Sequence, residues 1–192
     1  MFTYRREGGI KMITEEIICA KFLDMLDSTP YTKIKASDLA KTAGISRSSF
    51  YFYFDSISAV LQYIEDEFVA GLPDDTAVIR SYIAHEHHGK SLAQATTLAA
   101  EYWGKNLNVF RILSGPNGDP SFQQRLHVRT CRILDKFFGA SVPNIRKQLL
   151  AEAMSAAQWA MYRWWANHPE EVTIEELAKH VAELFNGWHI SA

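Results

Sequence analysis

The stretch from residue 37 to 54, SDLAKTAGISRSSFYFYF, constrains the fold more than any other part of the chain. Its first half carries apolar residues at helical spacing: Leu39, Ala40 and Ala43. Gly44 follows directly, and a glycine there can adopt the positive φ that ends a helix, with Ile45 filling the space beneath the turn. Ser46 is then placed to cap a second short helix. The pattern predicts a helix-turn-helix.

The second of these helices has one apolar side and one side suited to a partner. Phe50 and Phe54 are four residues apart and should turn inward together. The remaining side chains face outward: Arg47, Ser48, Ser49, Tyr51, Phe52 and Tyr53. A cation, hydroxyls and aromatic rings suit phosphates and base edges, and an exposed aromatic cluster indicates a binding surface. The alternative is an ordinary helical corner, because other helical proteins share this spacing.

Helices are also predicted on both sides of this corner. Apolar residues recur at helical spacing from residue 13 to 26, and Ser28, Thr29 and Pro30 end that helix. Ser56 is a predicted N-cap for a long helix that runs to about residue 68. We therefore expect a flexible arm at 1–12, a three-helix domain at 13–57 and a second domain at 58–192.

In order, spacing and residue type, residues 13–68 resemble the N-terminal DNA-binding domain of TetR/AcrR-type transcriptional regulators. The resemblance rests on Ile34, Ala36, Asp38, Leu39, Ala40, the run 43–47 and the run 50–54. It implies an all-helical homodimer that binds double-stranded DNA through its third helix. It also implies a larger C-terminal domain that senses a ligand or a protein partner.

By position, the resemblance assigns base or groove contacts to Arg47, Ser48, Ser49 and Phe52, and phosphate contacts to Tyr51 and Tyr53. The full set of expected DNA-binding residues adds Lys35, Ser37 and Ser46. The chain departs from the family at two positions, because Ser48 stands where the family often has Gly and Ile57 where it commonly has Lys. Losing that Lys removes one phosphate contact.

Charge is distributed unevenly along the chain. The net charge is −2, which does not indicate nucleic acid binding by itself. Residues 33–53, however, hold one anion, Asp38, against four cations: Lys33, Lys35, Lys41 and Arg47. Weak overall charge with basic charge on the motif is compatible with a specific DNA-binding protein. Arg5, Arg6 and Lys11 of the N-terminal arm are further candidates for phosphate contact.

Composition limits the class of protein. The 192 residues, 47% of them hydrophobic, are enough for one or two domains with full cores. No apolar run approaches the roughly 18 residues of a membrane span, and no leader pattern stands at the start. Cys19 and Cys131 lie in apolar helical stretches and are too few for a disulfide framework, although a redox pair is an alternative. We expect a cytoplasmic protein without a membrane partner.

The C-terminal part is predicted to be a helical bundle, which gives an all-α fold of about nine helices. The expected helices span about 75–88, 91–114, 120–138, 144–167 and 173–188. The clearest break is at 114–119, where Asp119 can cap the next helix before Pro120. The segment 110–122 and the run Arg163-Trp164-Trp165 resemble a TetR subgroup common in Gram-positive bacteria that includes the dihydroxyacetone kinase operon activator.

Two sites are expected in this bundle. In the family the last two helices form the dimer interface, for which the candidates are Met154, Ala157, Met161, Trp164 and Trp188. Large groups on central helices could line a ligand pocket: Trp103, Leu107, Phe110, Arg111, Phe137, Trp159 and Tyr162. For every one of these apolar side chains the alternative is a place in the monomer core.

Histidines at 85, 87 and 88 surround Glu86, and His85 with His88 could share a helix face. No further ligand pair at a characteristic spacing accompanies them, so we expect a solvated cluster and no metal site. No catalytic arrangement and no phosphate-cradling glycine loop is found, so we expect no cofactor and no enzyme.

Two hypotheses from different classes follow. The first is a homodimeric TetR-type regulator, expected to be a repressor, that binds a palindromic operator under the control of a small molecule or protein effector. The second is a helical partner-binding protein or small metalloenzyme in which the corner is structural.

Overall fold

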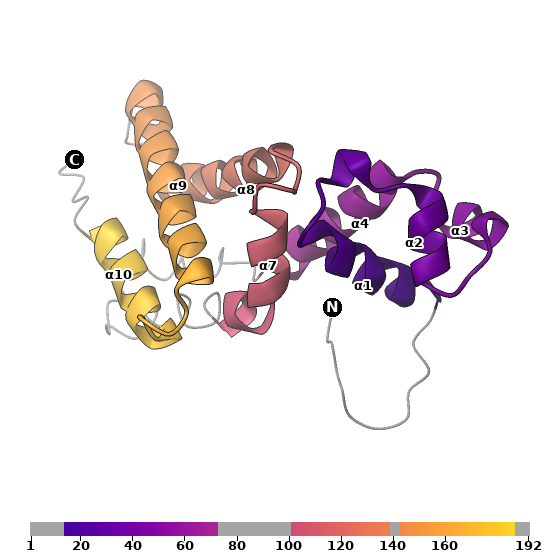
Figure 1. Ribbon diagram of the computed structural model, residues 1–192. Helices are drawn as coiled ribbons and strands as arrows, with labels where there is room; N and C mark the ends of the chain where they lie inside the picture. Colours follow the sequence, from indigo (N-terminus) through magenta and orange to yellow (C-terminus); the bar gives the residue numbers. More distant parts are fainter. Residues whose placement is uncertain (1–13, 73–100, 139–142, 187–192) are drawn as a thin grey trace. The chain divides into compact units, whose positions relative to one another are not determined.

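The computed structural model describes residues 14–72, 101–138 and 143–186, and side chains are not described at 134–138, 182 and 184–186. All regular structure in these ranges is helical and no strand occurs there, which confirms the predicted all-α class (Figure 1). The elements are α1 Thr14–Leu26, a 3-10 helix η1 Tyr31–Lys33, α2 Ala36–Thr42, α3 Arg47–Tyr53, α4 Ile57–Gly71, α7 Leu107–Leu113, α8 Ser121–Phe138, α9 Asn144–Asn167 and α10 Ile174–Asn186.

The chain divides into two compact units. The first comprises residues 1–71 and 108–122, and the second comprises residues 72–107 and 123–192. The sequence-based boundaries at 13–57 and 58–192 differ from this division, because α4 and the segment 108–122 lie in the first unit. Each unit is described by itself below.

The first unit is built on the helices α1 to α4, which each bury one apolar face. The core consists of Ile18, Cys19, Phe22 and Leu26 from α1, Leu39 and Ala40 from α2, Phe50 from α3, and Val60, Leu61, Ile64 and Phe68 from α4. Full burial of side chains of this size contributes roughly 1.5–3 kcal/mol each. Two short helices, α2 and α3 with seven residues each, are thereby stabilised by tertiary packing rather than by their length.

Helix α7 and the loop after it complete the first unit. Phe110 stacks on Phe68 with 5.9 Å between ring centroids, and Phe122 packs edge-on against Phe68 at 5.6 Å. Asn117 donates to the Asp27 carbonyl over 3.2 Å and accepts from the Tyr31 amide over 3.0 Å. The segment 108–122 is therefore attached to α4 by ring contacts, and to the turn after α1 and to η1 by hydrogen bonds.

An ion pair adds to this attachment. The Arg111 Nη1 lies 2.9 Å from the Asp27 Oδ1, with both side chains partly exposed. The hydrogen bond from Arg111 lowers the pKa of the Asp27 carboxyl below its ordinary value.

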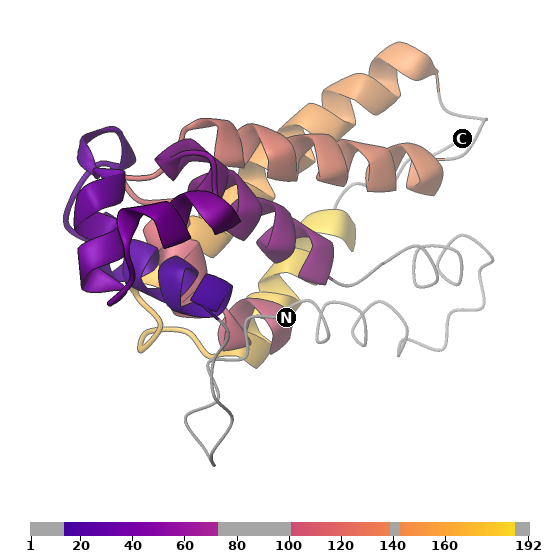
Figure 2. The same ribbon diagram turned by 90° about the vertical axis from the view of Figure 1, so that its right-hand side faces the viewer.

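The second unit contains α8, α9 and α10. Helices α8 and α9 cross at an angle in both views of the molecule (Figures 1 and 2). Trp103 and Tyr162 stack with 4.3 Å between ring centroids. Trp165 donates its indole N–H to the Val172 carbonyl over 2.9 Å, which links the end of α9 to the turn before α10. The inner face of α10 is buried and consists of Leu177, Ala178 and Val181.

Predicted helix boundaries agree with the structure at α8, α9 and α10 within two residues. The expected continuous helix at 91–114 is wrong, because the chain turns at Asn106. There the Asn106 amide hydrogen-bonds both the Tyr102 and the Trp103 carbonyls, and its side-chain Nδ2 also donates to Tyr102 over 2.9 Å. A short polar side chain that competes for a helix carbonyl in this way interrupts the ladder. The expected helix at 75–88 lies outside the described residues.

None of the described helices is both long enough and apolar enough to cross a lipid bilayer.

Candidate nucleic-acid interface

The turn between α2 and α3 is made by Gly44, whose φ is +70°. The Ile45 amide donates to the Ala40 carbonyl over 3.0 Å, and the Gly44 amide donates to Lys41 over 3.1 Å. These two hydrogen bonds form the Schellman motif, which satisfies carbonyls at the end of α2 and requires a left-handed residue. The role predicted for Gly44 is confirmed.

The start of α3 is fixed by Ser46, as predicted. The Ser46 Oγ accepts a hydrogen bond from the Ser49 amide over 3.0 Å and lies 2.8 Å from the hydroxyls of both Ser48 and Ser49. Phe50 is fully buried and Phe54 is 6% exposed, so both face inward as expected. Within this unit, then, Ser46 acts as a helix cap and Ser49 is partly covered.

The opposite side of α3 is open to solvent. Phe52 has 82% of its surface exposed, and Tyr51 and Tyr53 have 44% and 40%. The Arg47 guanidinium lies 5.5 Å from the centroid of the Tyr51 ring, and its Nη2 donates to the Tyr51 hydroxyl over 3.4 Å. The cation and the phenol are thus held together on the exposed side of the helix. We call the group Arg47, Ser48, Tyr51, Phe52 and Tyr53 the α3 face.

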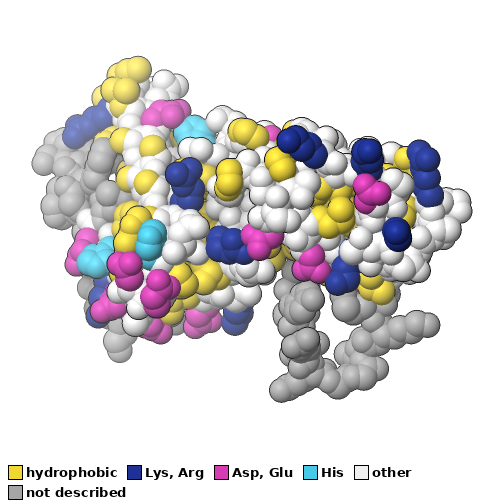
Figure 3. All heavy atoms as spheres, in the orientation of Figure 1, with side chains coloured by type: hydrophobic (Ala, Val, Ile, Leu, Met, Phe, Trp, Pro, Cys, Tyr) yellow, Lys and Arg dark blue, Asp and Glu magenta, His cyan; other side chains and the backbone are white. Residues whose placement is uncertain are grey.

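Two further predicted residues lie at the start of α2. Lys35 and Ser37 are both exposed, and the Ser37 hydroxyl donates to the Asp38 carboxylate over 3.4 Å. The space-filling view shows several Lys and Arg side chains over the region of α2 and α3 (Figure 3). The arm residues Arg5, Arg6 and Lys11 lie outside the described part of the chain.

Helix α9 has apolar side chains on two opposite sides. The inward side buries Ala151, Met154, Tyr162, Trp165 and Ala166. The outward side carries a row of exposed residues that we call the α9 stripe: Ile145, Leu149, Ala153, Ala156, Ala160 and Trp164. Spacings of three and four residues place all six on one helix face.

The expected dimer-interface residues are distributed over both sides of α9. Met154, which was expected at the dimer interface, is only 1% exposed, and its side chain packs in the core of its own chain. Trp164 is 46% exposed and stacks on His168, whereas Ala157 and Met161 are half-buried. Trp188 lies outside the described residues.

The expected pocket residues are also divided. Trp103 and Tyr162 come together in the second unit, but they stack on each other and are 8% and 2% exposed. Phe110 and Arg111 belong to the first unit instead. Leu107 and Trp159 are half-buried, and the side chain of Phe137 is not described.

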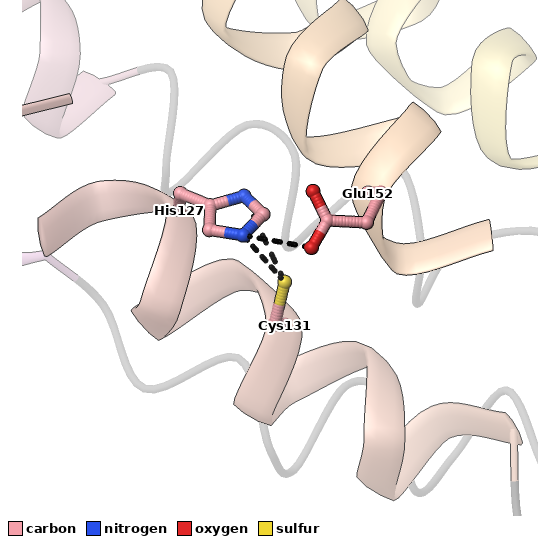
Figure 4. Close-up of side chains that lie close together, drawn as sticks. All are labelled: His127, Cys131 and Glu152. Atoms are coloured by element: carbon pink, nitrogen blue, oxygen red, sulfur yellow. Dashed lines mark hydrogen bonds and ion pairs between the residues drawn. The ribbon is translucent and has the colours of Figure 1, made fainter. Parts of the chain in front are cut away.

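A cluster that the sequence reasoning missed joins α8 to α9 (Figure 4). The ligand atoms of His127, Cys131 and Glu152 all lie within 4.8 Å of one another. The spacing of His127 and Cys131, four residues apart on a predicted helix, was the available signal. Glu152 comes from the next helix and could not be paired with them from the sequence. The expected histidine cluster at 85–88 lies outside the described residues.

The two cysteines have different surroundings. Cys19 is fully buried in the core of the first unit, and burial together with Glu15 and other acidic groups raises the pKa of its thiol to about 12. Burial and Glu152 also raise the pKa of the Cys131 thiol. Both cysteines are free, and a thiol as buried as Cys19 is unreactive.

Curated relatives match the chain over short stretches. An HTH-type transcriptional activator of the dhaKLM operon, DhaS from Lactococcus lactis subsp. lactis, is 36% identical over 66 residues, which cover 34% of this chain and 35% of DhaS. The HTH-type transcriptional regulator EthR from Mycobacterium tuberculosis is 47% identical over 55 residues, which cover 29% of this chain and 26% of EthR. The matched stretch thus spans about a third of the length of DhaS and about a quarter of the length of EthR.

Solved structures resemble the chain over almost its whole length. The dihydroxyacetone kinase operon activator DhaS has a TM-score of 0.60 at 22% identity, covering 92% of this chain and 96% of DhaS. The Pseudomonas aeruginosa efflux-pump repressor NalD has a TM-score of 0.65 at 14% identity, covering 91% and 94%. Thermus thermophilus FadR, a repressor solved with lauroyl-CoA, has a TM-score of 0.54 at 18% identity, covering 93% and 96%. At these identities the likeness shows the fold.

The family is decided by the C-terminal part. A TetR C-terminal family model, described as "Transcriptional regulator C-terminal region", matches residues 90–187. That match covers just over half of the chain. The helix-turn-helix near the N-terminal end of the chain lies outside the match and is consistent with the same family. The chain therefore belongs to the TetR family of transcriptional regulators.

Proposed function

We propose that this regulator binds a specific double-stranded DNA site through the α3 face. The observation that carries the proposal is the exposure of Arg47, Tyr51 and Phe52 on a seven-residue helix whose other side is packed into the core. A helix of this size fits the major groove of B-DNA. An exposed apolar ring such as that of Phe52, surrounded by polar groups, is typical of a binding surface.

Each part of the α3 face suits a different part of DNA. Arg47 can donate to the O6 and N7 atoms of guanine, and Phe52 can contact a thymine methyl group. The hydroxyls of Tyr51 and Tyr53 can donate to phosphates, as can Lys35 and Ser37 at the start of α2. We assign to Ser46 and Ser49 the more limited role of holding the start of α3, because Ser46 caps the helix through the Ser49 amide and the Ser49 side chain is partly covered.

We further propose that the regulator acts as a homodimer on a palindromic operator, with the α9 stripe at the interface. Ile145 and Leu149 are 66% and 64% exposed, and the alanines between Leu149 and Trp164 allow close approach of a second helix. A two-fold interface places two copies of α3 on two half-sites.

For regulation we propose repression in the cytoplasm, relieved by an effector bound to the second unit. An effector that favours one dimer geometry by roughly 1–3 kcal/mol changes operator occupancy 5- to 150-fold. The effector is a small molecule or a protein. Acyl-CoA thioesters are a reasonable first ligand to test, since FadR was solved with lauroyl-CoA. DhaS is named as an activator, so activation is the alternative to repression.

The experiment is a fluorescence anisotropy titration of the full chain against a fragment of the promoter next to its own gene. A shuffled fragment of equal length and composition is the control, and both are measured over a series of salt concentrations. The proposal predicts stronger binding to the promoter fragment, falling steeply with salt. Equal and weak binding to both fragments at low salt would favour the alternative, a partner-binding helical protein.

A further inference from the structure

The cluster of His127, Cys131 and Glu152 has the donor set of a transition-metal site. The His127 Nε2 lies 3.2 Å from the Glu152 Oε1 and 3.5 Å from the Cys131 Sγ. His127 and Cys131 lie on adjacent turns of α8, and Glu152 reaches them from α9 (Figure 4). The three side chains therefore converge on one point from two helices.

The two separations from His127 Nε2 are close to the ligand–ligand distances of a tetrahedral site. Zinc binds imidazole nitrogen and carboxylate oxygen at about 2.0–2.2 Å and thiolate sulfur at about 2.3 Å, which places ligands in a tetrahedral site about 3.3–3.6 Å apart. The two distances measured from His127 Nε2, 3.2 and 3.5 Å, lie close to these values. The Cys131 Sγ also lies 3.8 Å from Nδ1, so the thiol stands beside the ring face, and the Cys131 side chain has to rotate toward the Nε2 lone pair to reach an ion there.

A hydrogen bond at the second ring nitrogen fixes the orientation of the His127 imidazole. The His127 Nδ1 lies 3.0 Å from the hydroxyl of Ser155, whose side chain is buried on α9. The second ring N–H of a metal-binding histidine usually donates a hydrogen bond to an acceptor, which leaves the other ring nitrogen directed at the metal. In this arrangement Ser155 is a positioning residue and does not contact the ion.

Exposure leaves room for a fourth ligand. Glu152 keeps 68% of its side-chain surface exposed while His127 keeps 20%, so one side of the cluster faces solvent. Sulfur and imidazole ligands favour zinc-class ions over Mg²⁺ or Ca²⁺. We propose that His127 Nε2, Cys131 Sγ and Glu152 bind a single Zn²⁺-class divalent ion, with a fourth position open to water, so that the ion links α8 to α9.

Binding requires the thiol to lose its proton to the solvent, because the thiolate is the ligand. In the metal-free alternative, Ser155 donates to His127 Nδ1, and the Nε2–H donates to Glu152. That arrangement satisfies the same polar atoms and makes the cluster a structural contact only. The two interpretations differ in whether the cysteine sulfur becomes a ligand.

The direct test is titration of the metal-free full chain with Zn²⁺ in competition with a chromophoric chelator, repeated with Co²⁺. We expect one equivalent to bind and the Co²⁺ form to show thiolate-to-metal charge-transfer absorption. His127→Ala and Cys131→Ser should each weaken binding at least about tenfold, and Cys131→Ser should remove the charge-transfer band. Ser155→Ala should weaken binding but keep that band.

Matched controls come from elsewhere in the chain. His180 and Glu183 on α10 also form a histidine-carboxylate pair at 3.2 Å, but they are exposed and lack a thiol in the pair. His180→Ala should leave Zn²⁺ binding unchanged. Each variant is checked by circular dichroism for helix content.

A second measurement needs no substitution. Zn²⁺ should slow alkylation of Cys131 in the native chain, read by mass spectrometry of its peptide, while the absence of alkylation at the buried Cys19 checks that the chain stays folded. Failure of the native chain to bind one equivalent, or unchanged binding in both His127→Ala and Cys131→Ser, would overturn the proposal. The test is independent of DNA binding, so its failure leaves the proposed function intact.

Discussion

The exposed apolar surfaces of α3 and α9 differ in what surrounds them. On α3, Phe52 stands beside Arg47 and the tyrosine hydroxyls, so the surface offers charge, hydrogen-bond donors and an aromatic edge together. On α9, one exposed face carries Ile145 and Leu149, then three alanines, then Trp164. The first composition suits a polyanion with readable bases, and the second suits another apolar helix. Exposure of apolar groups alone therefore does not identify the partner.

A charge in the α9 stripe should give the largest effect. Ala160→Glu would bury an unpaired carboxylate in the proposed dimer interface, at a cost of roughly 2–5 kcal/mol, and shift the chain toward monomer. Sedimentation velocity over a concentration series measures this change. Gln123→Glu, which adds the same charge at an exposed position on α8, should leave the dimer intact. A wild-type chain that is monomeric throughout would disprove the interface.

Removing the Phe52 ring from α3 should weaken DNA binding and leave dimerisation through α9 unchanged. Phe52→Ala should weaken operator binding by roughly 1–3 kcal/mol, because its contact with a base edge is lost. Since Phe52 is 82% exposed, stability should change by less than about 0.5 kcal/mol. Anisotropy and thermal unfolding measure the two quantities. Trp164→Ala on the stripe should instead weaken dimerisation, and an equal loss of dimer in Phe52→Ala would contradict the distinction.

The turn before α3 should respond to backbone strain alone. A Cβ at Gly44 would meet nothing within 4 Å, so Gly44→Ala tests the positive φ without a clash. We expect a loss of about 1–2 kcal/mol in the free energy of unfolding, measured by urea denaturation. Gly44→Asn should cost less, because asparagine tolerates this conformation. Equal costs for alanine and asparagine would show that the strain argument is incomplete.

The smallest expected effect is that of the Asp27–Arg111 ion pair. The pKa of Asp27 is lowered in the folded chain, so its contribution is fully present above the pKa of an unfolded aspartate. The contribution is lost as the pH falls through the lowered folded value. Because both groups are partly exposed, we expect less than about 1 kcal/mol.

A double-mutant cycle with Asp27→Asn and Arg111→Met measures this coupling. It should be positive near pH 7 and shrink toward zero as the solution is acidified below about pH 4. A coupling free energy that grows on acidification would contradict a lowered pKa of Asp27 in the folded chain.

Features that depend on local chemistry could be predicted from the sequence, and features that depend on tertiary packing could not. Gly44, Ser46 and Ser56 act on backbone groups within six residues, and all three have the predicted roles. Asp119 likewise accepts from the Ser121 amide at the start of α8. These signals located the helix-turn-helix corner correctly, and its DNA-binding role stays a prediction.

The faces of α9 could not be assigned in this way. Apolar residues occur all around this helix, so its sequence does not say that Met154 faces the core while Leu149 faces solvent. The same holds for Glu152, whose approach to His127 depends on how α8 and α9 cross. The break at Asn106 was missed because an asparagine inside an apolar pattern is compatible with a continuous helix.

The central claim is that the α3 face reads DNA, and a single comparison tests it most directly. We would titrate the promoter fragment with the wild-type chain, with Arg47→Ala and with Lys179→Ala, which removes an exposed cation on α10. We predict that Arg47→Ala binds about 5- to 150-fold more weakly, while Lys179→Ala binds like the wild type. Equal affinity of Arg47→Ala and the wild type would contradict the claim.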